Sequence, residues 1–112
     1  MRLRLPSRNV CERFRLAYEL EGAQKGVDVL TRYYRIPRMR IKVDGRGFRK
    51  SDQAWYSSGR ARFRKRCLKK SVILHELAHH LISYKGLEIT RKEEEKLCDR
   101  FAKEIMAKAR MR

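Results

Sequence analysis

Residues 69–86 read KKSVILHELAHHLISYKG, and this stretch decides how the chain folds. Its polar start leads into apolar residues at helical spacing, and Gly86 is a residue type that commonly ends a helix. The core-like apolar positions of this helix are Val72, Ile73, Leu77, Leu81 and Ile82. The pattern therefore predicts one partly buried helix against which other elements pack.

Two histidines in this stretch are spaced for a metal ion. His75 and His79 lie four residues apart, which places both imidazoles on one helix face, one turn above the other. That spacing suits one zinc ion. Glu76 lies about 100° around the helix from His75, where it can reach a zinc-bound water without ligating the metal. His80 lies about 100° from His79 and is not expected to ligate. The competing interpretation, a pair of ordinary histidines without a metal, is disfavoured by the helical context.

The third zinc ligand must come from another part of the chain. A catalytic zinc ion usually takes three protein ligands and leaves its fourth position to water. The chain has no histidine outside residues 75–80, so a carboxylate or a cysteine must serve. We expect Glu95, because its face of a predicted final helix can pack across the histidines. The same face carries Cys98, Asp99 and Ala102. Glu94 stays a competitor because the helix register is predicted only to within a residue or two. Glu88, in the connecting loop, is a weaker candidate.

Three further helices are predicted from start and stop signals. Ser7 is a suitable N-cap for the first helix, and Gly22 ends it. A second helix follows and cannot continue through Pro37. Thr90, with Glu93 three residues later, forms a capping box that begins the last helix. The apolar faces of the three helices hold Val10, Phe14, Ala17 and Tyr18, then Val27, Leu30 and Tyr34, and finally Leu97, Phe101 and Ile105.

Short strands are predicted between the second helix and the histidine helix. Apolar and basic residues alternate over 39–43, and further strands are expected over 54–56 and 60–64. Turns are expected at 44–47 and 57–59, the latter closing a hairpin. We therefore expect an α+β fold: N-terminal helices, a short three-stranded antiparallel or mixed sheet, the histidine helix and a C-terminal glutamate helix.

Length and composition favour one intracellular domain. The 112 residues suit a single domain over 1–112, and no apolar run approaches the roughly 20 residues of a membrane span. The N-terminal region carries no export signal, so we expect a cytoplasmic protein. The three cysteines are widely spaced, fit no disulfide framework, and are expected to be small buried residues. Only three side-chain amides occur, a balance that resembles proteins from hot environments.

The second half of the chain resembles a family of zinc peptidases. HELAH at 75–79, followed by Glu95 and Asp99 in the pattern Glu-x-x-x-Asp, resembles the gluzincin metallopeptidases in their compact form. The likeness is greatest to the minimal gluzincins, or minigluzincins, with the ImmA/IrrE-type peptidases as larger relatives, and it begins near Trp55. In such relatives alanine often stands at the position of Cys98. The resemblance implies a zincin-like fold in which zinc is bound by His75, His79 and Glu95, Glu76 is the general base, and Asp99 orients a ligand.

The same resemblance implies a zinc-dependent endopeptidase that acts on polypeptides. Zinc would lower the pKa of its bound water towards about 7, and Glu76 would take the proton and pass it to the departing amine. The strand before the histidine helix could form the cleft rim and pair with an extended substrate. The residues of that strand are Arg60, Ala61, Arg62 and Phe63. An edge strand protected from aggregation by positive charge is an equally good interpretation.

The resemblance also implies a latent, zymogen-like form. In that form residues 107–112 would block the zinc ion through Met111 or the terminal carboxylate, and the alternative is a frayed basic tail. Residues 105–107 lack the proline that often follows this stretch in such relatives.

The strongly basic composition is also compatible with a second class of function, binding to nucleic acid. The net charge is +17, from 30 basic and 13 acidic residues, and it suits a polyanion such as nucleic acid as a partner. A solvated basic surface explains it about equally well, because the charge is spread along the whole chain. A homodimer is also compatible with the sequence. The alternative to a peptidase is a basic DNA-associated regulatory protein that either cleaves a repressor or holds a zinc site without turnover.

Overall fold

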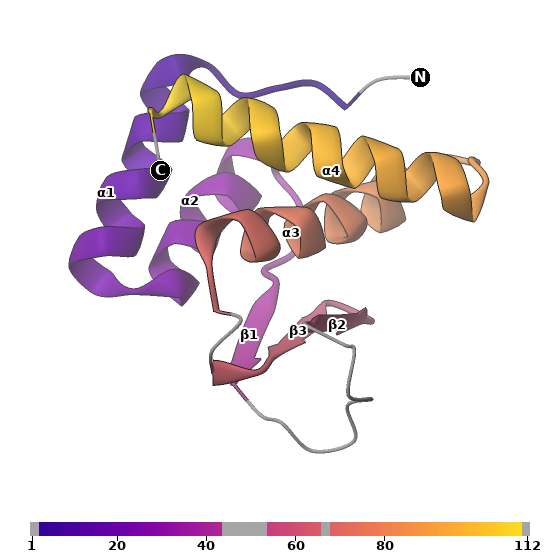
Figure 1. Ribbon diagram of the computed structural model, residues 1–112, viewed down its shortest axis with the longest axis horizontal. Helices are drawn as coiled ribbons and strands as arrows, with labels where there is room; N and C mark the ends of the chain where they lie inside the picture. Colours follow the sequence, from indigo (N-terminus) through magenta and orange to yellow (C-terminus); the bar gives the residue numbers. More distant parts are fainter. Residues whose placement is uncertain (1–2, 44–53, 66–67, 111–112) are drawn as a thin grey trace.

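The computed structural model describes residues 3–43, 54–65 and 68–110, and these form four helices and three strands. The elements are, in chain order, α1 (Arg8–Glu21), α2 (Ala23–Tyr34), β1 (Arg40–Val43), β2 (Ala54–Ser57), β3 (Arg60–Phe63), α3 (Lys70–Lys85) and α4 (Arg91–Lys108). Figure 1 shows α4 lying along α3, with the small sheet on the opposite side of α3. The α+β class predicted from the sequence is confirmed.

The two N-terminal helices begin and end where local signals predict. The Ser7 hydroxyl accepts a hydrogen bond from the Val10 backbone N–H at 3.3 Å and so caps α1. Gly22, with φ of 103°, lets α2 follow α1 after a single residue. Helix α2 ends at Arg35 in the left-handed conformation, two residues before Pro37. The two helices pack against each other at one end of the molecule.

The strands form a mixed sheet in the order β1-β3-β2. Strand β3 runs parallel to β1 and antiparallel to β2, so that Ala61 has Ile41 on one side and Tyr56 on the other. Ser58 and Gly59 join β2 to β3 with φ of 49° and 81°, as a tight two-residue hairpin turn requires. The mixed sheet and the hairpin agree with the sequence prediction. The turn expected at 44–47 lies outside the described residues.

Helix α3 lies between α4 and the sheet and contributes much of the core. Its predicted apolar positions are buried, except Val72, which is half-buried. Gly86, with φ of 66°, ends the helix, and Thr90 caps α4 by accepting from the Glu93 backbone N–H at 3.2 Å. The core draws on every layer of the fold, and its largest fully buried side chains include Phe14, Leu30, Met39, Phe63, Leu77 and Phe101.

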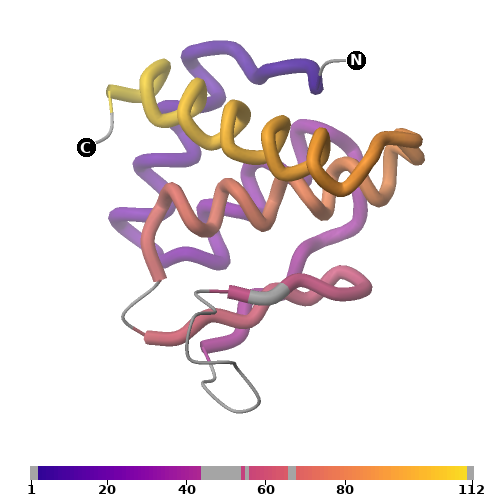
Figure 2. Tube along the Cα trace, turned by 45° about the vertical axis from the view of Figure 1, so that its right-hand side comes forward, coloured from indigo at the N-terminus to yellow at the C-terminus, as the bar shows by residue number. Residues whose placement is uncertain are grey.

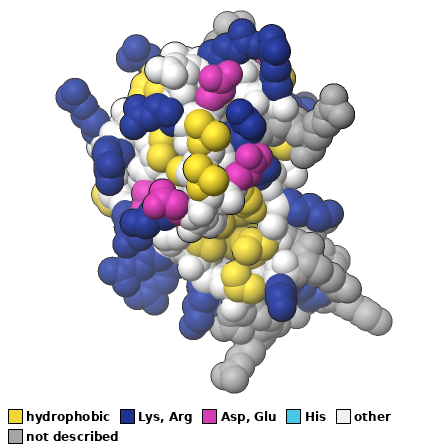
Figure 3. All heavy atoms as spheres, turned by 90° about the vertical axis from the view of Figure 1, so that its left-hand side faces the viewer, with side chains coloured by type: hydrophobic (Ala, Val, Ile, Leu, Met, Phe, Trp, Pro, Cys, Tyr) yellow, Lys and Arg dark blue, Asp and Glu magenta, His cyan; other side chains and the backbone are white. Residues whose placement is uncertain are grey.

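The surface is basic over the end of the molecule that holds α1. Figure 3 shows lysine and arginine side chains spread over this face, with a few acidic side chains between them. In the described ranges, no helix has both the length and the apolar character that a bilayer span requires.

Candidate metal centre

The two motif histidines lie on the side of α3 that meets α4. Their ring centroids are 4.9 Å apart, and the side chains of His75 and His79 are 20% and 15% exposed. Helix α4 is held there because Phe101 and Ile105 are buried in the core and the Thr90 cap sets where the helix begins. The acidic residues that this register brings to the histidines are Glu94, Glu95 and Asp99.

Glu95 faces both imidazoles with its carboxylate. Its Oε2 lies 3.0 Å from Nε2 of His75, and its Oε1 lies 3.1 Å from Nε2 of His79. One side chain from α4 therefore meets the same ring nitrogen of both motif residues.

Two further carboxylates contact the other nitrogen, Nδ1, of each ring. Asp99 Oδ1 lies 2.8 Å from Nδ1 of His75, and Glu94 Oε2 lies 2.5 Å from Nδ1 of His79. Because a carboxylate only accepts hydrogen bonds, each Nδ1 donates its proton. This bonding fixes the orientation of both rings and directs Nε2 towards Glu95.

The bonding pattern requires positive charge between the rings and Glu95. A neutral imidazole carries one N–H, which Asp99 or Glu94 already accepts at Nδ1. Each Nε2 then presents a lone pair to a carboxylate, which is repulsive unless the ring gains a second proton or a cation lies between them. Ligand atoms of a tetrahedral zinc ion are about 3.3 Å apart, given metal–ligand distances near 2.0–2.2 Å. The separations of 3.0 and 3.1 Å, each to a different oxygen of Glu95, are close to that value, so two imidazoles and one carboxylate are compatible with one zinc ion.

Glu76 is a buried carboxylate beside the histidine pair. Only 9% of its surface is exposed. Burial raises its pKa above the ordinary value, while the nearby His79 and His75 lower it and Glu95 raises it. A carboxylate with a raised pKa accepts a proton more readily, which suits a general base.

Cys98 is a second buried group at the same place. One ring nitrogen of His75, one of His79 and the Cys98 sulfur all lie within 4.8 Å of one another. Burial, together with the neighbouring carboxylates, raises the pKa of its thiol. The expectation of buried cysteines is confirmed for Cys11 and Cys98, and Cys67 lies outside the described residues.

His80 points away from this cluster and towards the sheet. Its Nε2 lies 2.6 Å from the Pro37 carbonyl oxygen, and its Nδ1 lies 2.8 Å from the Tyr56 hydroxyl. Burial lowers the pKa of His80 below its ordinary value, and the Pro37 contact raises it in part. Its position agrees with the expectation that it is not a ligand.

The predicted backbone pairing of a substrate with the strand before the histidine helix does not fit the sheet. Strand β3, which contains Arg60, Ala61, Arg62 and Phe63, is the middle strand of the sheet. Its backbone is paired with β1 on one side and β2 on the other, so it has no open edge for a substrate. Ala61 and Phe63 are buried in the core. The competing interpretation of an edge strand is wrong for the same reason.

The predicted inhibitory segment, residues 107–112, starts at the end of α4 remote from the histidines. Lys108, the last residue of α4, lies about 20 Å along the helix from Glu95 at 1.5 Å per residue. Its Nζ donates to the Pro6 carbonyl at 2.9 Å. Figure 2 shows this end of α4 beside the start of α1. The described part of the segment therefore does not cover the cluster, and Met111 lies outside the described residues.

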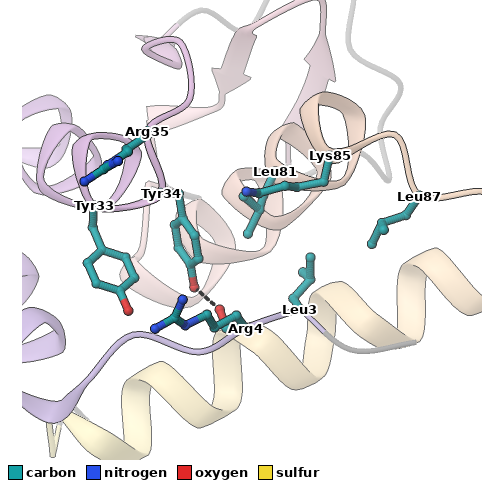
Figure 4. A pocket seen from close by; sticks show the side chains of 8 residues that line it. All are labelled: Leu3, Arg4, Tyr33, Tyr34, Arg35, Leu81, Lys85 and Leu87. Carbon is teal, nitrogen blue, oxygen red and sulfur yellow. Dashed lines mark hydrogen bonds between the residues drawn. The ribbon is translucent and has the colours of Figure 1, made fainter.

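A separate pocket of about 570 Å³ lies between α2, α3 and the N-terminal segment. Figure 4 shows the Tyr34 hydroxyl pointing at the Arg4 carbonyl oxygen, to which it donates a hydrogen bond. Arg4, Arg35 and Lys85 give the lining a basic character. The lining includes none of the histidines or carboxylates described above, so the pocket is distinct from the candidate metal centre.

The structure gathers one cluster from residues that the sequence places on two helices. It brings together His75, Glu76, His79, Glu95 and Asp99. The sequence analysis kept Glu94 only as a competing zinc ligand, and its contact with Nδ1 of His79 was missed. Glu88 is exposed in the loop before α4. No family model, curated protein or solved structure matches the chain.

Proposed function

We propose that this chain is a zinc-dependent endopeptidase of the gluzincin type, on a minimal zincin-like fold. The observation that carries the proposal is the position of Glu95, whose two carboxylate oxygens face Nε2 of His75 and of His79. Two histidines and one glutamate are a known ligand set for catalytic zinc. The contacts of Asp99 and Glu94 with Nδ1 support the proposal, because carboxylates commonly orient ligating imidazoles in this way.

The expected chemistry is hydrolysis of a peptide bond in a polypeptide substrate. When bound, zinc polarises the scissile carbonyl and makes a water molecule more acidic. Glu76 is the general base, because it follows His75 on α3 and is buried beside the histidine pair. Glu76 takes a proton from the attacking water and passes it to the nitrogen of the departing amine.

Replacement of Glu76 by glutamine tests this role. Glutamine keeps the size of the side chain but cannot accept the proton. We expect kcat/KM for an unfolded protein substrate in excess zinc to fall by about 10²- to 10⁴-fold. Zinc content and the circular dichroism spectrum should stay unchanged, because Glu76 does not ligate the ion.

Glu93→Gln is the matched control, since the Glu93 side chain is exposed on α4 and only its backbone N–H caps the helix. This variant should cleave the substrate at the wild-type rate. A wild-type protein that binds no zinc, or a Glu76→Gln variant as active as the wild type, would refute the proposal.

A further inference from the structure

A buried thiol lies against the proposed zinc ligands. Cys98 follows Glu95 by three residues on α4, so both side chains face α3. Cys98 is fully buried, whereas the Glu95 side chain is 52% exposed. The Cys98 sulfur and one nitrogen each of His75 and His79 lie within 4.8 Å of one another. A second donor thus reaches the histidine pair from the protein interior, while Glu95 reaches it from the solvent side.

The resulting set of donors suits a closed zinc site. Imidazole nitrogen and thiolate sulfur are the commonest ligands of four-coordinate zinc, and a site with four protein ligands leaves no position for water. Among the four ligands themselves, the Glu95 carboxylate and a Cys98 thiolate together neutralise the two positive charges of the ion. A neutral assembly costs less to bury than a charged one.

We propose that Cys98 binds the zinc ion through its thiolate and closes the site in the resting protein. The inference rests on the proposed function, because it requires zinc at His75 and His79. As the zinc–sulfur bond forms, the S–H bond breaks and its proton goes to solvent. Water enters the coordination sphere only after the thiolate leaves, so the wild-type chain is a slow peptidase whose rate is limited by Cys98.

The alternative role for Cys98 is that of a small residue filling space between α3 and α4. Cys11 offers a matched comparison, because it is also fully buried but lies on α1, with its sulfur 3.9 Å from the Pro6 carbonyl oxygen. Alanine at Cys11 should leave metal ligation unchanged.

The test measures sulfur ligation directly in the full chain loaded with Co²⁺ or Zn²⁺. Wild type and Cys11→Ala should show a thiolate-to-cobalt charge-transfer band in the near ultraviolet. X-ray absorption at the zinc edge should show one sulfur at about 2.3 Å. Cys98→Ala should bind metal without either signal. It should also cleave an unfolded protein at least about tenfold faster than wild type, which corresponds to about 1.4 kcal/mol of barrier.

The outcomes separate this inference from the proposed function. Metal bound by the wild type without sulfur, or a Cys98→Ala variant no faster than wild type, overturns closure by Cys98 and leaves the peptidase proposal standing. A wild-type protein that binds no metal would refute both proposals. Equal cleavage by Cys98→Ala and by Cys98→Ala/Glu76→Gln would refute the peptidase proposal. The inference that Cys98 closes the site would then be refuted as well, because it rests on that proposal. If circular dichroism shows the alanine variant unfolded, Cys98→Ser, which is closer in size, replaces it in each comparison.

Discussion

Two carboxylates of α4 set the orientation of the motif imidazoles through Nδ1. Asp99 accepts from His75 and Glu94 accepts from His79, which leaves both Nε2 atoms for a metal. The Glu94 side chain is 32% exposed and that of Asp99 is 63% exposed. Water therefore screens the Glu94 contact less, and its loss should have the larger effect.

Alanine at Asp99 or at Glu94 is expected to weaken zinc binding by about 10- to 100-fold, with the larger loss at Glu94. Competition with a chromophoric chelator measures the affinity. Glu93→Ala removes a neighbouring exposed carboxylate and should bind zinc as the wild type does. Equal affinities in all three variants would show that the Nδ1 contacts do not support the ligands.

His80, by contrast, links α3 to the sheet through a chain of hydrogen bonds. Its Nε2 donates to the Pro37 carbonyl, so Nδ1 carries the lone pair that accepts from the Tyr56 hydroxyl. The same hydroxyl accepts from the Gly59 N–H at 3.2 Å. Burial lowers the pKa of His80, which keeps the ring in the neutral form that this bonding needs.

Phenylalanine at Tyr56 should lower the free energy of unfolding by about 2 kcal/mol, because it leaves the His80 Nδ1 and the Gly59 N–H without their partner. Urea denaturation provides the measurement. Tyr84→Phe is the control: its ring lies 4.8 Å from that of His80, but the residue is 49% exposed. We expect a change below about 0.5 kcal/mol there. Similar losses in both variants would argue against a specific role for the Tyr56 hydroxyl.

Among the elements, the ends of the helices were predictable because their signals are local. Ser7, Gly22, Gly86 and Thr90 act on backbone groups within one turn, and each stands at the helix end that the sequence assigns to it. The helical period likewise predicts that Glu95 and Asp99 share a face of α4, as the structure shows.

The order of the strands was not predictable in the same way. Alternating side chains identify a strand, but they do not say which strands become its neighbours. Strand β1 pairs with β3 over a long separation in sequence, and this pairing places β3 in the middle of the sheet. The contact of Glu94 with His79 was missed for a related reason: it depends on how closely α3 and α4 approach, which residue spacing does not reveal.

Helices α1 and α2 approach each other closely at Gly26. A Cβ atom at this position would lie 3.0 Å from the Tyr18 Cβ and 3.3 Å from the Phe14 backbone oxygen. These atoms are fixed to α1 and cannot turn aside as the end of a flexible side chain can. The close approach therefore depends on the absence of a side chain at residue 26.

Alanine at Gly26 should lower the free energy of unfolding by about 1–2 kcal/mol. The cost of overpacking exceeds the gain of about 1 kcal/mol that alanine brings to a helix interior. Urea denaturation would measure the change. Lys25→Ala, at the exposed neighbouring position, should be neutral or slightly stabilising. A Gly26→Ala protein as stable as Lys25→Ala would mean that the two helices can move apart without lowering the free energy of unfolding.

Across the whole molecule, negative charge is concentrated at the candidate metal centre. The chain has a net charge of +17 and 13 acidic residues. Four of these acids, Glu76, Glu94, Glu95 and Asp99, lie around the histidine pair. Carboxylates gathered in this way repel one another and attract a cation, so an ion bound between α3 and α4 would relieve the repulsion and join the two helices.

Zinc should therefore stabilise the entire fold. At a free zinc concentration 100 times its Kd, binding adds about 2.7 kcal/mol to the free energy of unfolding. For a domain of this size that gain raises Tm by about 10 °C, and scanning calorimetry with and without a chelator measures it. Glu76→Gln should keep the increase, because Glu76 is the proposed general base and not a proposed ligand, and His79→Ala should lose it. Magnesium, which prefers oxygen ligands, should produce none. A Tm independent of zinc, or an equal increase in His79→Ala, would show that the ion does not bind at the histidine pair.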